Sequence, residues 1–221
     1  MTKRVVIDLE MCKVPQIYRS KDRSLSMEII QIGAVLMNEN NDILDEYSSY
    51  VKPEYGVVDN FIKGLTGIRE ADVKKARPLG IIVRELLERI GTKDFTFYSW
   101  SDTDYRQFRK ELHVKGIESD EFVPLLNQKN WIDYQQVFEN RFQFGKRLSL
   151  KDALFYLELD PEGRLHDGLA DAYNTARIIA EMEKYPDKLF LLDRVRKNEQ
   201  EAEQVGTCLG SLLQGLKTQI A

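Results

Sequence analysis

The first 51 residues contain three segments rich in β-branched and apolar residues, and they constrain the fold more than any other feature of the chain. Residues 4–10, 28–37 and 43–51 each have the length and composition of a strand. The last two are joined by Asn38-Glu39-Asn40-Asn41-Asp42, a stretch of residues that favour turns. The sequence therefore predicts a β-meander near the N-terminus.

After residue 51 the pattern changes to helices that alternate with a strand. Apolar spacing predicts a helix over residues 78–90, a strand over 95–100 and a helix over 105–112. Two further helices are expected, one that opens at Ser149 and one over residues 168–180. Strands followed by this alternation indicate an α/β fold with a mixed sheet.

Length and composition fit one soluble domain with a short appendage. The chain has 221 residues, of which 43% are hydrophobic and 31% charged, enough for one sizeable core. We expect one domain over residues 1–185 and a helical extension over 186–221. Apolar runs are too short to span a bilayer and no apolar signal region precedes the first strand, so a cytoplasmic protein without membrane association is predicted.

Acidic residues and a histidine in three separate segments are the candidates for chemistry. Asp8 and Glu10 lie two apart on a strand, so both carboxylates point to one face. Asp104 lies where a predicted strand gives way to a helix, and His166 and Asp171 flank the start of the last predicted helix. Each has an ordinary alternative: solvated acids, a helix N-terminus stabilised by acids, or a buried structural histidine.

The order of these residues resembles that of the DEDDh 3′→5′ exonucleases. One branch trims RNA in eukaryotes and includes bacterial KapD-like proteins, and two segments are similar to it: Val6-Ile7-Asp8-Leu9-Glu10-Met11-Cys12 and Glu28-Ile29-Ile30-Gln31-Ile32-Gly33-Ala34. The resemblance extends over residues 4–182. It implies a ribonuclease H-like fold, in which α-helices flank a mixed sheet. It also implies hydrolysis of phosphodiester bonds at the 3′ end of single-stranded nucleic acid, with RNA as the expected substrate and nucleoside 5′-monophosphates as products.

The resemblance also implies a catalytic role for each of the five residues. Asp8, Glu10 and Asp171 would bind one divalent cation, Asp8 would share a second, and Asp104 would join through water. His166 would be the general base, a role that suits an imidazole with an unperturbed pKa of about 6.5. The implied cofactors are two Mg²⁺ or Mn²⁺ ions, because two hard cations together activate water and neutralise charge on the phosphate.

Six further residues are candidates for contact with the substrate. By resemblance, Met11 would contact the terminal sugar through its backbone amide, and the segment 65–68 would pack against the last bases; a plain turn is the alternative for this segment. A net charge of -4 means that any phosphate contacts must be local, and residues 141–151 contain cations without an acid. The candidates are Met11, Leu65, Thr66, Ile68, Arg147 and Lys151.

Two other functions are compatible with the sequence. A KapD-like chain could be a regulatory module that binds a protein partner, such as a sporulation signalling kinase, with the apolar residues 209–216 as its docking surface. The same metal centre would also suit a DNA exonuclease, because recognition of the 2′-hydroxyl decides between RNA and DNA. Partner binding that survives Asp8→Asn, without metal-dependent hydrolysis, would favour the regulatory module.

Overall fold

The structure is a computed structural model that describes residues 3–19, 25–91, 94–117 and 119–184. Contacts divide the chain into residues 1–180 and 181–221. The predicted domain boundary at residue 185, the predicted extension 186–221 and the apolar segment 209–216 lie outside the described residues. No helix within the described part is long and apolar enough to cross a membrane.

The described residues form one mixed sheet with the strand order β3-β2-β1-β4-β5. β1 (Lys3–Lys13) pairs antiparallel with β2 (Met27–Met37), and β2 pairs antiparallel with β3 (Ile43–Tyr50). β4 (Phe95–Ser99) pairs parallel with β1, and β5 (Trp131–Asp133) pairs parallel with β4. The predicted meander and mixed sheet are confirmed.

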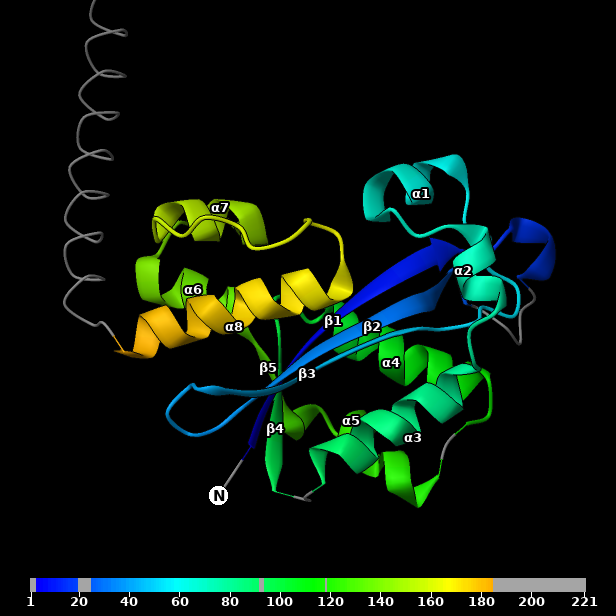
Figure 1. Cartoon of the computed structure of the whole chain (residues 1–221), viewed down its shortest axis with the longest axis horizontal. Helices are drawn as coiled ribbons and strands as arrows, with labels where there is room; N and C mark the ends of the chain where they lie inside the picture. The colour runs from blue at the N-terminus through cyan, green and yellow to red at the C-terminus, as the bar shows by residue number, and fades with distance from the viewer. Residues whose placement is uncertain (1–2, 20–24, 92–93, 118, 185–221) are drawn as a thin grey trace, which may run out of the picture. The chain divides into compact units, whose positions relative to one another are not determined.

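Helices cover both faces of this sheet (Figure 1). On one side lie α3 (Leu79–Ile90), α4 (Thr103–Val114) and α5 (Val123–Leu126). On the other side lie α6 (Tyr134–Phe142), α7 (Leu150–Tyr156) and α8 (Gly168–Lys184). The short helices α1 (Asn60–Thr66) and α2 (Glu70–Lys74) lie near the end of β1. The predicted starts at Pro78, Ser149 and Gly168 agree with the observed starts of α3, α7 and α8.

Alternate residues of β1 serve the two faces of the sheet. Val5, Ile7 and Leu9 are buried in the core that α3 and α4 cover. Each fully buried side chain of this size contributes about 1.5–3 kcal/mol to the stability of the fold. The apolar face of β1 therefore holds the strand in place. The intervening residues, among them Asp8 and Glu10, point to the opposite face, where α8 lies.

A buried ion triad closes the far end of α4. Lys115 Nζ lies 2.7 Å from Glu28 Oε1 and 2.8 Å from Glu111 Oε1, and all three side chains are almost fully buried. The Glu28 carboxylate also accepts hydrogen bonds from the backbone N–H groups of residues 54–56. Despite its burial, hydrogen bonds and the positive charge of Lys115 lower the pKa of Glu28. The triad therefore joins β2, α4 and the segment that leads to α1.

Candidate active site

Asp104 of α4 lies directly beside the two acids of β1. Its Oδ1 atom accepts a hydrogen bond from the backbone N–H of Leu9 at 3.1 Å, so the first turn of α4 is attached to β1 between Asp8 and Glu10. Asp104 is only 5% exposed. The structure thus places this residue at the strand-to-helix position predicted from the sequence, and close to the Asp-x-Glu pair.

The N-terminus of α8 is attached to the sheet next to the same acids. The backbone N–H of Gly168 donates to Gln31 Oε1 at 3.1 Å, and Gln31 Nε2 donates to Asp167 Oδ2 at 3.1 Å. Gln31 is buried in β2 and lies opposite Glu10 in the strand pairing. One glutamine side chain therefore joins the first residues of α8 to the carboxylate-bearing part of the sheet.

Two glycines allow α8 to approach the sheet at backbone contact. Gly33 lies opposite Asp8 in the β1–β2 pairing. A Cβ atom added to Gly33 would lie 2.0 Å from the backbone carbon of Gly168 and 2.2 Å from the N of Leu169. Since real Cβ atoms do not approach backbone so closely, this packing requires glycine at position 33. The contact sets the height of α8 above the acids.

His166 lies in the loop that leads into α8. Its backbone is in the left-handed region, with φ 64°, and its N–H donates to Asp171 Oδ2 at 2.9 Å. The side chain is exposed, which excludes the alternative of a buried structural histidine. Potential ligand atoms of Glu10, His166 and Asp171 all lie within 4.8 Å of one another. Segments more than 150 positions apart in the sequence thus meet at one point.

Burial and mutual repulsion raise the pKa values of the clustered carboxyls. Burial is the largest cause throughout. It raises the pKa of Glu10 to about 8, with further contributions from the charges of Asp171 and Asp104. It raises the pKa of Asp104 to about 7 and that of Asp8 well above its usual value. The pKa of Asp171 is also raised, although the hydrogen bond from the His166 N–H opposes the shift.

The donor atoms of this cluster fit a hard divalent cation. Asp171 Oδ1 is buried and has no hydrogen-bond partner among the described residues. A buried carboxylate oxygen without a partner is costly unless a cation or water satisfies it. Carboxylate oxygens are the ligands that Mg²⁺ and Mn²⁺ prefer. A bound cation would also offset the burial and the repulsion that raise the carboxyl pKa values.

The candidate base-contact segment is the end of α1 rather than a plain turn. Leu65 and Thr66 belong to the helix, and Gly67 ends it with φ 78°. Thr66 is 4% and Ile68 2% exposed, and the Thr66 hydroxyl accepts the N–H of Ile68 at 3.0 Å. Leu65 is 37% exposed. Burial therefore leaves Leu65 as the side chain of this segment that is most available to a ligand.

The remaining candidate substrate residues are Met11, Arg147 and Lys151. The side chain of Met11 packs against the core on the α3–α4 side of the sheet, because it alternates with Glu10 along β1. A contact of Met11 with a sugar would therefore use its backbone amide. Arg147 and Lys151 are exposed near the start of α7. Arg147 hydrogen-bonds to Gln135 and Gln136 of α6 and forms an ion pair with Asp133 at 3.6 Å.

Arg164 also lies at this site, and Phe61 lies on α1, which Arg164 contacts; the sequence patterns pointed to neither residue. Arg164 Nη2 donates to the carbonyl oxygens of Gly64 at 2.8 Å and Leu65 at 3.1 Å, which ties the His166 loop to the end of α1. Phe61 is 63% exposed and precedes Leu65 by one helical turn. The available signals were a cation two residues before His166 and an aromatic residue four positions before Leu65.

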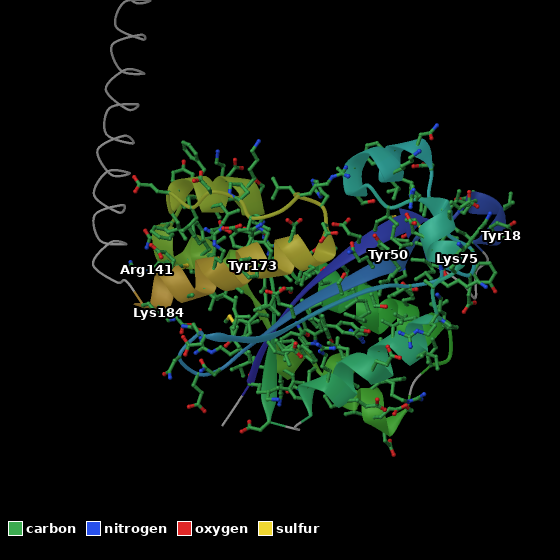
Figure 2. The ribbon with its side chains drawn as sticks, viewed as in Figure 1. Tyr18, Tyr50, Lys75, Arg141, Tyr173 and Lys184 are labelled. Carbon is green, nitrogen blue, oxygen red and sulfur yellow. The ribbon has the colours of Figure 1, made fainter. Side chains whose placement is uncertain are left out.

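A cavity of about 510 Å³ lies next to the His166 loop. Tyr50 of β3 and Tyr173 of α8 line it (Figure 2), together with Arg164 and Asp167. Its volume is in the range of small-molecule sites. The N-terminal turn of α8 therefore separates the acid cluster from an aromatic cavity.

The curated proteins that this chain is similar to include several exoribonucleases. ERI1 exoribonuclease 2 of Danio rerio is 32% identical over 80% of this chain and 34% of its own length. 3′-5′ exoribonuclease 1 of Rattus norvegicus is 28% identical over 70% of this chain and 46% of its own length. The chain thus spans between a third and a half of the length of these curated relatives.

Solved structures have the same fold. The nuclease domain of 3′hExo, described as a DEDDh family member bound to rAMP, superposes with a TM-score of 0.68 at 24% identity, over 82% of this chain and 92% of that domain. A 3′-exonuclease solved for its 3′-end specific recognition of histone mRNA stem-loop gives a TM-score of 0.70 at 23% identity, over 82% and 81% of the two chains. The ribonuclease H-like fold predicted from the sequence is confirmed.

The match to a family decides the assignment. The RNase T model, described as Exonuclease, matches residues 5–179, which include all five residues of the predicted catalytic set. DEDDh exonucleases of this family use divalent metal ions, in agreement with the donor set described above. The chain belongs to the exonuclease family.

Proposed function

We propose that this chain is a divalent-metal-dependent 3′→5′ exonuclease that hydrolyses single-stranded RNA and releases nucleoside 5′-monophosphates. The observation that carries the proposal is the convergence of Glu10, His166 and Asp171, whose ligand atoms lie within 4.8 Å of one another. Asp8 and Asp104 adjoin them through β1. Clustered carboxylates next to an exposed imidazole are suited to hydrolysis of a phosphodiester.

RNA is proposed as the substrate on the basis of the relatives. Those compared are named exoribonucleases, and the two solved structures concern a histone mRNA stem-loop and rAMP. A DNA exonuclease would use the same carboxylates, so the choice depends on groups that contact the sugar. We therefore treat RNA and DNA as the two arms of one experiment.

We propose that Asp8, Glu10, Asp104 and Asp171 hold two Mg²⁺ or Mn²⁺ ions. Four carboxyls with raised pKa values need more positive charge than the neighbouring Arg164 supplies. The unpartnered Asp171 Oδ1 is a ready ligand atom. When bound, such ions neutralise charge on the phosphate and lower the pKa of the attacking water.

The proposed role of His166 is to accept the proton of the attacking water at an imidazole nitrogen. Its exposed ring can reach solvent and substrate, while its backbone N–H is engaged by Asp171 Oδ2. The left-handed backbone of a non-glycine residue is a strained conformation of the kind found at functional sites. The bond to Asp171 thus holds the loop and leaves the ring available for proton transfer.

The proposed path of the last bases runs over α1. Phe61 and Leu65 present an exposed apolar pair at i and i+4, and exposed aromatic side chains stack on nucleobases. Lys13 Nζ lies 5.5 Å from the centre of the Phe61 ring, so a cation is available for a phosphate next to this surface. Arg164 holds α1 beside His166, which places stacking and proton transfer next to each other.

A regulatory role without hydrolysis is not favoured. A binding module would have no need for an unsatisfied buried carboxylate oxygen beside an exposed histidine, because such groups lower stability without a ligand. All four acids and the histidine of the predicted set are present and adjoin one another. Partner binding without hydrolysis is therefore treated as the alternative that the experiment must exclude.

The test is to incubate the full chain with 5′-labelled single-stranded RNA or DNA of one sequence, with Mg²⁺, Mn²⁺ or EDTA. We expect stepwise shortening from the 3′ end that requires metal and is faster on RNA. Asp8→Asn and His166→Ala should each lose most of the activity. Asp120→Asn, which changes an exposed acid far along the chain in the same way, is the matched control.

The outcomes separate the candidate functions. Faster shortening of DNA would replace RNA with DNA as the substrate. Undiminished activity in Asp8→Asn would refute the assignment of the site. A folded wild-type chain that shortens neither strand with either metal would refute the nuclease and leave the binding module.

A further inference from the structure

A row of basic side chains follows the exposed face of α4. Arg106, Arg109, Lys110 and His113 are all exposed and follow the i, i+3, i+4, i+7 spacing of one helix face. These four residues line a cavity of about 380 Å³. They are called the α4 basic cluster below.

Two positive charges of this cluster, those of Arg109 and Lys110, are not balanced by nearby acids among the described residues. Arg106 forms an ion pair with Asp102 one turn earlier. For Arg109 and Lys110, no acid among the described residues is within ion-pair distance. The one acid nearby on the helix, Glu111, is buried and paired with Lys115. Like charges at this spacing destabilise a helix by a few tenths of a kcal/mol, so helix stability does not explain the arrangement.

The cluster is on the helix that begins at the active site. Asp104 is in the first turn of α4 and is bound to β1, and Arg106 follows two residues later. From Arg106 to His113 the helix rises about 10 Å at 1.5 Å per residue. Charges on one strand of a duplex are about 3.4 Å apart along the axis and those of a single strand are farther apart, so this length corresponds to two or three phosphates at most. The cluster therefore leads away from the acids over the length of a few nucleotides.

The chemistry of the lining favours phosphate over other anions. Two guanidinium groups can each donate two parallel hydrogen bonds to a phosphate. The described lining residues include no apolar side chain that would enter a lipid bilayer. The chain carries a net charge of -4, so it repels a polyanion except where cations are concentrated.

We propose that the α4 basic cluster binds the phosphodiester backbone of the nucleic acid upstream of the 3′ end. This inference rests on the proposed function, because it needs a polynucleotide whose end lies at the acids. It adds a second binding region, on the opposite face of α4 from Asp104, and makes affinity depend on substrate length. A substrate of two or three nucleotides ends before it reaches the cluster.

The test compares Arg109→Gln/Lys110→Gln with the wild-type chain in RNA binding. Glutamine keeps helix propensity close to that of arginine and lysine. Fluorescence anisotropy with a labelled 12-nucleotide single-stranded RNA is recorded in EDTA, which prevents hydrolysis, from 50 to 200 mM salt. Lys75→Gln/Lys129→Gln removes the same charge from two exposed positions elsewhere and is the control. Figure 2 labels Lys75, which directly follows α2.

Counterion release gives the expected size of the effect. Each lost phosphate contact reduces the slope of log affinity against log salt by about 0.7 for a single strand. Two lost contacts reduce it by about 1.4. The ratio of the wild-type affinity for RNA to that of Arg109→Gln/Lys110→Gln should then fall about sevenfold between 50 and 200 mM salt. The control should keep the wild-type slope, and all three proteins should shorten a trinucleotide at the same rate.

Several results would overturn the proposal. They are an unchanged salt slope in Arg109→Gln/Lys110→Gln, an equal change in the control, or no RNA binding by the wild-type chain. Loss of binding to phosphatidylserine vesicles with unchanged RNA binding would assign the cluster to a membrane instead. Failure of the nuclease proposal is seen separately, as absence of metal-dependent shortening in the wild-type chain.

Discussion

Replacement of Gly33 by alanine is expected to displace α8 from the sheet and to reduce the proposed nuclease activity strongly without unfolding the chain. A Cβ atom at this position would lie 2.0 Å from the backbone carbon of Gly168 and 2.2 Å from its oxygen. These are backbone atoms of the helix start, so no side-chain rotation can relieve the contact. The helix itself must move.

The structure gives the size of this movement. Ordinary van der Waals contact begins at 3.4 Å, so the backbone of Gly168 must retreat by about 1.4 Å from its present 2.0 Å. Asp171 and His166 move with it, and a misplacement of about 1 Å can reduce a rate about 100-fold. Overpacking costs about 1–3 kcal/mol, which lowers Tm by roughly 2–12 °C for a chain of this size.

The assay is metal-dependent shortening of labelled RNA, recorded together with thermal unfolding by circular dichroism. Gly64→Ala is the matched control, because Gly64 is inside α1 and a Cβ there meets nothing within 4 Å. It should keep full activity, and Tm should stay the same or rise, since alanine is the better helix former. Wild-type activity and Tm in Gly33→Ala would refute the argument that backbone contact sets the position of Asp171.

Three further predictions concern the substrate surface, the buried ion triad and the metal. Phe61→Ala should weaken single-stranded RNA binding about five- to 150-fold, the range for loss of one stacked base; an equal loss in Phe155→Ala, an exposed aromatic on α7, would contradict a specific platform. Lys115→Met leaves two buried glutamates without their cation and should lower the free energy of unfolding by about 3–5 kcal/mol. The loss of stability should be larger at pH 8 than at pH 5, because the mutation raises the folded-state pKa of the glutamates and stability then falls as pH rises. Denaturant unfolding measures the free energy of unfolding at both pH values. A loss no larger than that of exposed Lys75→Met would refute the prediction. Mg²⁺ at about 100 times its dissociation constant should add about 2.7 kcal/mol and raise Tm by roughly 5–11 °C, and an undiminished shift in Asp171→Asn would argue against the assigned ligands.

Local pattern predicts the parts of this fold that depend on neighbours in the sequence. The β-branched run before Asp8 and the alternation through Glu10 predict a strand with both acids on one face, and β1 has this arrangement. The hydroxyl of Ser149 opens α7 as expected, because it accepts the N–H of Asp152. The short elements α1, α2 and β5 have 7, 5 and 3 residues and contain too few turns or alternations to produce a periodic signal.

The contacts that assemble the site depend on tertiary packing and were not predictable from local pattern. Gln31 and Gly33 stand in a segment that the family resemblance identifies, but their roles follow only from the position of Gly168 more than 130 residues later. The side chain of Met11 faces the core for the same reason that Glu10 faces the site, since the two alternate along β1. Burial of Thr66 and Ile68 likewise follows from the packing of α1 on the sheet.

The same strand that stabilises the core also carries the groups that oppose folding. Val5, Ile7 and Leu9 bury fully apolar side chains on one face of β1, while on the other face Asp8 and Glu10 are held close to further acids at raised pKa values. An acid whose folded-state pKa is raised destabilises the fold once the pH exceeds its ordinary value. The apolar face must offset this cost in the metal-free chain. Cations that bind only the folded acid cluster remove the repulsion, so metal binding and stability are necessarily linked. Metal binding therefore stabilises the contact among the three segments that supply the acids, in addition to the hydrogen bonds between them.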